Sequence, residues 1–367
     1  ELEDEEKRNE IYQKFRQFIG RHRSYPDANW SLPTDILNKI EETANKFKTE
    51  DIILNGLFLF DDQAPIFIEG KEDDDWQMRH QMISDKRVEF VKEIILKYGL
   101  EKVFELARKS EHPYLFGNAL ALLDNLANDD RLKVYEKIGS EDNREILLAI
   151  EFIRVSEIKS SQGEQLVMLE KLIKNGLSKD GIVRFYNSLN SNINLWKYIE
   201  QKDKEIESLY WKSIIRELYI NNKVELLFAV KKLNFFNKHI VLLNTIGMGL
   251  FQQEVKKDLT SDEVLKILEE IDLNSIDDNA QFDQNHFNYI MKFLYERDDY
   301  DEERGAKVEM KFFFAFSGHH SVTPKNLFKV MSKNPQEYFD FLTWFYLPED
   351  EELAEKEGMI NRYYHDV

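Results

Sequence analysis

The sequence predicts an all-α fold of irregular antiparallel helix-pair repeats, an α-solenoid of the HEAT or armadillo type. Apolar residues recur at helical spacing in one pair of segments after another. Glycine and proline are scarce, 14 and 7 among 367 residues, so few residues interrupt the predicted helices. The first helices of successive pairs begin at intervals of about 29 to 44 residues, which is typical of helical solenoid repeats. With 42% hydrophobic residues the chain can bury a large core.

The first 99 residues are expected to form a helical entry module. A connection, RHRSYPDANWSLP, separates its first two helices, and the SLPT sequence at its end opens the second. The segment DDQAPIFIEGKEDDD is the least helix-like part of the module. Gly99 is expected to end the last helix, since glycine favours the backbone conformation that follows a helix. The predicted helices cover residues 9–19, 31–47, 51–60 and 74–98.

Residues 100–347 are expected to form the repeat array, followed by an acidic tail or the start of a further segment at 348–367. Long polar loops are predicted at 272–285 and 296–304, where charged and amide residues dominate. The predicted helices of the array are 100–109 with 114–127, 131–138 with 143–155, 164–175 with 178–189, 195–201 with 204–221, 224–233 with 237–256, 261–271 with 286–296, and 308–316 with 326–331 and 335–346.

The formal net charge of −19 argues against nucleic acid as a partner, because a phosphate backbone is bound mainly by lysine and arginine. An anionic membrane surface is disfavoured for the same reason. The densest basic stretch is interpreted as the solvated side of the first helix. It consists of Lys14, Arg16, Arg21, His22 and Arg23.

The absence of cysteine excludes disulfides, iron–sulfur clusters, thiolate zinc sites and thiol nucleophiles. The most apolar run, residues 240–251, is shorter than the roughly 20 residues that cross a bilayer. No secretory leader opens the sequence, and we expect a cytoplasmic location. The chain begins at Glu1 in an acidic run, which suggests a piece of a longer protein.

One segment has the residue types of a metal-dependent nuclease or hydrolase. Asp61, Asp62, Glu69 and Lys71 resemble the acids and lysine with which restriction-type nucleases bind a divalent metal and polarise water. Such a site is built on a sheet, and Ile66–Ile68 is the single short strand candidate in a helical chain. A surface loop between helices is therefore the favoured interpretation, with the nuclease as the alternative.

Other polar clusters have structural interpretations. Asp73, Asp74 and Asp75 are consecutive, unlike calcium ligands, and are expected to cap the following helix. His319 and His320 have no partner at metal-ligand spacing and predict a turn. The glycines of TIGMG, residues 245–249, indicate close helix packing rather than a phosphate-binding loop. No catalytic, metal-binding or cofactor-binding residue, and no cofactor, is predicted.

Aromatic residues are abundant and mostly predict core positions. Those of the central region, Trp196, Tyr210, Trp211, Phe235 and Phe236, lie at spacings expected for one buried helix face. The segment PQEYFDFLTWFY, which begins at Pro335, is apolar around much of its circumference. A helix of that kind needs cover on two sides.

Several stretches resemble the helical regions of large, mostly uncharacterised bacterial multidomain proteins, some of which are similar to NTPase-type antiviral defence proteins. The resembling stretches are YPDANWSLPTDIL, the region from KRVEFVKEII to EHPYLFGNALA, DKEIESLYWKSI with Tyr210 and Trp211, and LFKVMSKNPQEYFDFLTWFYLP. These are packing motifs, so the resemblance implies a helical scaffold and no catalytic residue.

We therefore expect a non-catalytic scaffold or sensor segment of a larger bacterial protein that contacts a protein partner or sister domains. The acidic balance predicts a partner with a basic contact patch and salt-sensitive association. The alternatives are the metal-dependent nuclease or hydrolase around Asp62, Glu69 and Lys71, and a helical module that binds nucleic acid by shape.

Overall fold

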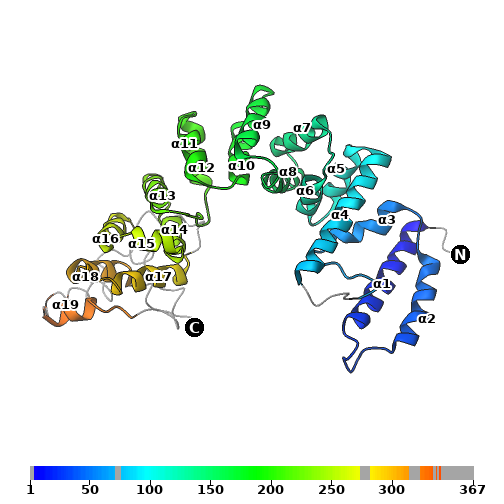
Figure 1. Ribbon diagram of the computed structural model, residues 1–367, viewed down its shortest axis with the longest axis horizontal. Helices are drawn as coiled ribbons and strands as arrows, with labels where there is room; N and C mark the ends of the chain where they lie inside the picture. The colour runs from blue at the N-terminus through cyan, green and yellow to red at the C-terminus, as the bar shows by residue number, and fades with distance from the viewer. Residues whose placement is uncertain are drawn as a thin grey trace. The chain divides into compact units, whose positions relative to one another are not determined.

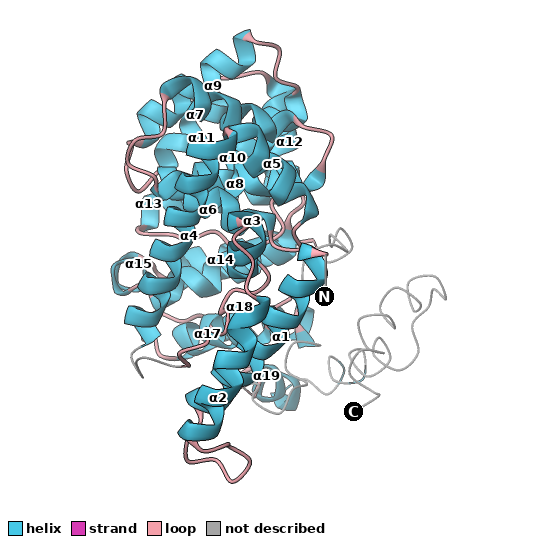
Figure 2. Cartoon of the chain, turned by 90° about the vertical axis from the view of Figure 1, so that its right-hand side faces the viewer, coloured by secondary structure: helices cyan, strands magenta, loops and turns pink. Residues whose placement is uncertain are grey.

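The computed structural model describes residues 4–70, 76–272, 282–313 and 323–333, together with residues 336 and 339. Within these residues the structure contains nineteen α-helices, three short 3₁₀ helices and no strand, which confirms the all-α prediction (Figures 1 and 2). None of the described helices is both long and apolar enough to cross a membrane.

The chain divides into two compact units, residues 1–190 and 191–367. This division falls inside the range 100–347 that was predicted as one array. The predicted boundaries at 99/100 and 347/348 stay predictions, and residues 348–367 lie outside the described part of the chain.

Unit 1 begins with a helical hairpin, and its later helices pack on their neighbours in the sequence (Figure 1). Helix α4 packs on α5 and α6, and α8 packs on α5, α6, α7 and α10. The helices are α1 (Glu5–Ser24), α2 (Thr34–Ala44), α3 (Ile52–Gly56), α4 (Trp76–Tyr98), α5 (Leu100–Lys109), α6 (Pro113–Leu122), α7 (Asn128–Glu136), α8 (Asn143–Ser156), α9 (Gln162–Lys174) and α10 (Lys179–Ser188), with 3₁₀ helices η1 (Asn45–Phe47), η2 (Leu57–Phe60) and η3 (Lys137–Gly139).

In unit 2, too, helices pack mainly on their neighbours in the sequence. Helix α14 packs on α13, α15 and α17, and α18 packs on α16 and α19. Its helices are α11 (Ile193–Glu200), α12 (Lys204–Ser213), α13 (Lys223–Phe235), α14 (His239–Phe251), α15 (Gln253–Asp258), α16 (Ser261–Glu270), α17 (Gln284–Tyr295), α18 (Glu302–Lys311) and α19 (Leu327–Lys333).

Short polar side chains determine where many helices begin. Each accepts a hydrogen bond from a backbone N–H of the first turn, which would otherwise have no partner within the helix. The Ser161 and Thr260 caps are reciprocal, because Glu164 and Glu263 accept from the backbone N–H of the capping residue. Gly99 has a φ of +81° and follows α4 directly, as predicted. The side-chain caps are Asp4, Asp51, Asp142, Ser161, Ser178, Asn192, Asp203, Asn222, Thr260, Asp283 and Asp301.

Two glycines allow a close backbone approach in the helix pairs α6–α8 and α14–α17. A Cβ atom on Gly117 of α6 would lie 2.1 Å from the Leu148 carbonyl oxygen of α8. A Cβ atom on Gly247 of α14 would lie 2.4 Å from the Cβ of His286 on α17. The predicted role of the TIGMG glycines in close helix packing is therefore confirmed at Gly247.

Several predicted elements were wrong in extent; the helix predicted over 114–127, for example, ends at Leu122. The helix predicted to reach residue 221 ends at Ser213, and the following segment buries Leu218, whose N–H donates to the Thr245 hydroxyl. The helix predicted over 237–256 is broken at Gln252, between α14 and α15. The charge run predicted as a loop over 296–304 already contains the start of α18, because Asp301 caps that helix.

Candidate functional site

The acidic segment that suggested a nuclease is a loop in unit 1 held by arginine side chains. Arg16 and Arg23 of α1 donate to the carbonyl oxygens of Ile66 and Ile68. Arg87 of α4 donates to three further carbonyl oxygens, those of Leu59, Asp62 and Gln63, at 2.7–3.1 Å. These bonds satisfy backbone groups that no helix or sheet pairs, so they determine the path of the loop.

The carboxylates of this loop do not form a metal centre among the described residues. Asp62 and Glu69 are exposed, and Asp62 accepts a hydrogen bond from the N–H of Ala64 two residues away. Desolvation raises the pKa of Asp61 above its ordinary value, opposed by the nearby guanidinium of Arg16. In the described ranges no three His, Cys, Asp or Glu side chains are placed to hold one metal ion. Lys71 lies outside those ranges.

Further sequence candidates also lie outside the described residues. They are the three aspartates at 73–75, the histidine pair at 319–320 and most of the aromatic segment that begins at residue 335.

The basic stretch of α1 was predicted to be a solvated surface, and this was wrong for its inward-facing members. Arg16 is 4% exposed and its guanidinium carbon lies 3.7 Å from the centre of the Phe58 ring. Burial lowers the pKa of Arg16 to about 10. Arg23 forms an ion pair with Glu41 of α2 at 2.6 Å. Lys14 and Arg21 are exposed, as predicted.

The same helix presents a cluster of one buried and three half-exposed rings, which we call the aromatic platform. It consists of Phe18, His22, Tyr25 and Trp30, at the end of α1 and in the loop that leads to α2. Consecutive ring centroids lie 4.4 Å apart for Phe18 and His22, 5.2 Å for His22 and Trp30, and 6.0 Å for Tyr25 and Trp30. Phe18, Tyr25 and Trp30 are 42%, 49% and 52% exposed.

Hydrogen bonds fix the platform to the hairpin. The buried imidazole of His22 accepts from the backbone N–H of Leu32 through Nδ1 at 3.0 Å. The His22 carbonyl accepts from the Ser31 hydroxyl at 2.9 Å. Two turn hydrogen bonds, Ala28 N–H to Tyr25 O and Ser31 N–H to Ala28 O, order the intervening loop. The loop forms the tip of the α1–α2 hairpin (Figures 1 and 2). The rings are therefore held in place before any partner binds.

The sequence that carries the platform has more cations than carboxylates, unlike the whole chain. Residues 11–34 contain four cationic side chains and one carboxylate, Asp27, a net charge of +3 against −19 for the protein. Arg21 forms no ion pair or hydrogen bond with any residue that the structure describes. A free guanidinium therefore lies on the helix face that carries Phe18 and Tyr25.

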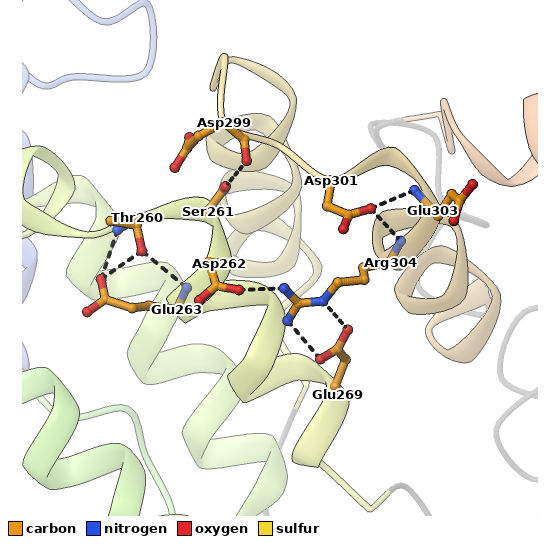
Figure 3. Close-up of polar contacts among 9 residues, drawn as sticks. All are labelled: Thr260, Ser261, Asp262, Glu263, Glu269, Asp299, Asp301, Glu303 and Arg304. Atoms are coloured by element: carbon orange, nitrogen blue, oxygen red, sulfur yellow. Dashed lines mark hydrogen bonds and ion pairs between the residues drawn. The ribbon is translucent and has the colours of Figure 1, made fainter.

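Unit 2 has a polar network between α16 and α18, which Figure 3 shows in close-up. Arg304 binds both oxygens of Glu269, at 2.8 and 2.9 Å, and also Asp262 at 2.5 Å. The hydroxyl of Ser261 donates to the Asp299 carbonyl at 2.8 Å. Because every cation and carboxylate in these contacts joins one helix or loop to another, the network is a structural link between α16 and α18.

The sequence prediction of buried aromatic residues succeeded in part. Trp196, Tyr210 and Trp211 are at most 1% exposed, as predicted, whereas Phe235 is 77% exposed. Tyr25 and Trp30 were treated as packing residues within YPDANWSLPTDIL, and His22 was assigned to the basic stretch. The available signal was the helical spacing of Lys14, Phe18, Arg21 and Tyr25, which places them on one side of α1.

No protein-family model, curated protein or solved structure matches this chain.

Proposed function

We propose that this chain is a non-catalytic scaffold or sensor segment of a larger, cytoplasmic bacterial protein, and that it contacts a protein partner or sister domains. The aromatic platform of unit 1 is the observation that supports this proposal. The helices of the chain would stack as irregular HEAT- or armadillo-like repeats, in which each helix pair buries its apolar face against the neighbouring pairs.

The platform has the composition of a protein-binding hot spot. Tryptophan, tyrosine and arginine dominate the energetics of protein interfaces, and here Trp30, Tyr25 and Arg21 occur together. A contiguous exposed apolar cluster on a protein surface is typical of a binding site, and Phe18, Tyr25 and Trp30 form such a cluster. The rings are also preorganised by His22, which reduces the entropy that the platform itself loses when a partner binds.

Site-specific photo-crosslinking tests this proposal. A photoreactive phenylalanine analogue replaces Trp30 in the full-length parent protein, and a second variant carries it at Leu96, which is 78% exposed on α4. We expect a crosslink to one defined protein or sister domain from position 30 and none from position 96. That partner is then purified, and its affinity is measured by calorimetry for the wild type and for the variant Phe18→Ser, Tyr25→Ser, Trp30→Ser.

We expect the triple variant to weaken binding by at least about 30-fold, because it removes the anchoring rings. An unchanged affinity, or equal crosslinking from positions 30 and 96, would contradict the proposed function.

A further inference from the structure

We infer that the aromatic platform binds an acidic peptide segment of the partner protein, with carboxylates that contact Lys14 and Arg21 and an apolar side chain on the rings. This inference rests on the proposed function and adds the chemistry of the partner. It reverses the expectation drawn from the whole-chain charge, which predicted a partner with a basic contact patch.

Local charge determines the sign of the contact. At about 0.1 M salt, exposed charges more than about 10 Å apart are largely screened from each other. A bound segment therefore responds mainly to the exposed cations Lys14 and Arg21 and the exposed Asp27, rather than to the −19 of the whole protein. No residue that the structure describes forms an ion pair or hydrogen bond with Arg21, and the ion pair of Lys14 with Glu10 is exposed and weak.

The spacing of the two cations predicts the spacing of the acids. Lys14 and Arg21 lie seven residues apart on α1, a rise of about 10 Å at 1.5 Å per residue. In a peptide in the polyproline II conformation, three residues make one turn with a rise of about 3.1 Å each, so side chains three positions apart lie on one face about 9 Å apart. Phe18 lies between the two cations, and Tyr25 and Trp30 lie beyond Arg21. The matching segment has two acids three positions apart, an apolar residue between them and another after the second.

A nucleic acid fits this surface less well than a short peptide. Two of the four cations in residues 11–34, Arg16 and Arg23, point inward and bind the carbonyl oxygens of Ile66 and Ile68. Only Lys14 and Arg21 remain for phosphates, while each further phosphate along a strand meets an acidic protein. A second copy of the chain is also disfavoured, because it would place one cationic platform against another in a symmetric pair.

The test is fluorescence anisotropy of the full chain with a labelled synthetic peptide. The peptide has two glutamates three positions apart, leucine between them and phenylalanine after the second. Matched peptides replace the glutamates with glutamine, or the leucine and phenylalanine with alanine. The protein variants are Arg21→Glu and Trp30→Ala, with Lys92→Glu on α4 as the charge-matched control, since Lys92 is also exposed. Circular dichroism verifies that each variant is folded.

We expect Arg21→Glu to weaken binding at least about tenfold, Trp30→Ala about 30-fold, and Lys92→Glu less than about twofold. Both matched peptides should bind at least about tenfold more weakly than the parent peptide. Equal binding of the glutamine peptide, or equal loss in Lys92→Glu, would overturn the inference. So would tighter binding of an oligothymidylate than of the peptide, or self-association of the chain that Trp30→Ala abolishes.

Failure of this inference differs from failure of the proposed function. A defined crosslink from position 30 to a segment without acids would leave the proposed function standing and remove the acidic-peptide inference. No crosslink from position 30 would remove both.

Discussion

The ring centroids of His22 and Trp30 lie 5.2 Å apart with an interplanar angle of 69°, and this edge-on contact joins a buried side chain to an exposed one. His22 belongs to α1, whereas Trp30 lies in the loop that leads to α2. The contact couples the position of the exposed indole to the core of the hairpin. A surface ring held in this way can bind a partner at a low entropic cost.

We predict that His22→Ala lowers the free energy of unfolding by about 1–2 kcal/mol, because it leaves the N–H of Leu32 without its acceptor and removes two ring contacts. Urea unfolding followed by circular dichroism measures the change. Phe18→Ala is the control, with an expected loss below about 1 kcal/mol, since Phe18 is 42% exposed. Equal losses in the two variants would show that His22 does not support the platform.

The two glycines of α14 give a matched pair for the packing of unit 2. Gly247→Ala places a methyl group within 2.7 Å of three His286 atoms, including the backbone oxygen and Cα, whereas Gly249→Ala meets side-chain atoms at an ordinary 3.6 Å. We predict that Gly247→Ala destabilises by about 2–3 kcal/mol. Gly249→Ala should stabilise by up to about 1 kcal/mol, because alanine favours the helix. Thermal unfolding measures both, and a neutral Gly247→Ala would contradict the close approach of α14 and α17.

A variant of Arg87 tests whether this side chain holds the acidic loop in its observed path. Its guanidinium donates to three carbonyl oxygens, so Arg87→Met leaves those carbonyls without their donor. We predict a loss of about 2–4 kcal/mol in the free energy of unfolding. Lys92→Met on the exposed side of the same helix should change it by less than about 0.5 kcal/mol. Similar values from chemical denaturation of the two variants would refute the structural role of Arg87.

The hydrogen bonds that the Glu145 carboxylate accepts predict that unit 1 loses stability in acid. Burial raises the pKa of Glu145, but hydrogen bonds from Ser140, Lys137 and Arg108 outweigh burial and lower it below its ordinary value of 4.5. The folded protein therefore binds fewer protons at this site than the unfolded chain. The stabilisation is complete above pH 4.5 and is lost as pH falls through the lowered pKa of the folded state.

The measurement for Glu145 is the free energy of unfolding as a function of pH. We predict that Glu145→Gln costs about 2 kcal/mol at neutral pH and that this cost shrinks as pH falls below the ordinary glutamate pKa. Glu141→Gln, at an exposed position in the connection that precedes α8, should leave the pH profile unchanged. A cost for Glu145→Gln that does not depend on pH would contradict this account.

The sequence predicted the helices well because their signals are local. Apolar spacing and capping residues such as Ser161 and Thr260 act within one helix or one turn, so they can be found without knowledge of the fold. Predicted helices failed where a distant contact decides the backbone. The segment after Ser213 leaves the helix, and the N–H of Leu218 instead meets the Thr245 hydroxyl of α14.

The candidate sites were harder to predict because each depends on partners distant in sequence. Arg16 was assigned to a solvated face, yet its donation to the Ile66 carbonyl, fifty residues away, buries it. Trp30 was assigned to packing, and the structure leaves it half exposed beside His22. Charge and hydrophobicity alone do not distinguish a buried arginine from a surface one, or a core ring from a binding ring.

The most direct test of the binding claim is a charge swap between Arg21 and the peptide. Anisotropy is measured for the wild type and Arg21→Glu, each with the glutamate peptide and with a peptide whose glutamate opposite Arg21 is replaced by lysine. We predict that Arg21→Glu weakens binding of the glutamate peptide at least about tenfold and that the lysine peptide restores most of this loss. Equal affinities in all four combinations would contradict the acidic-peptide account.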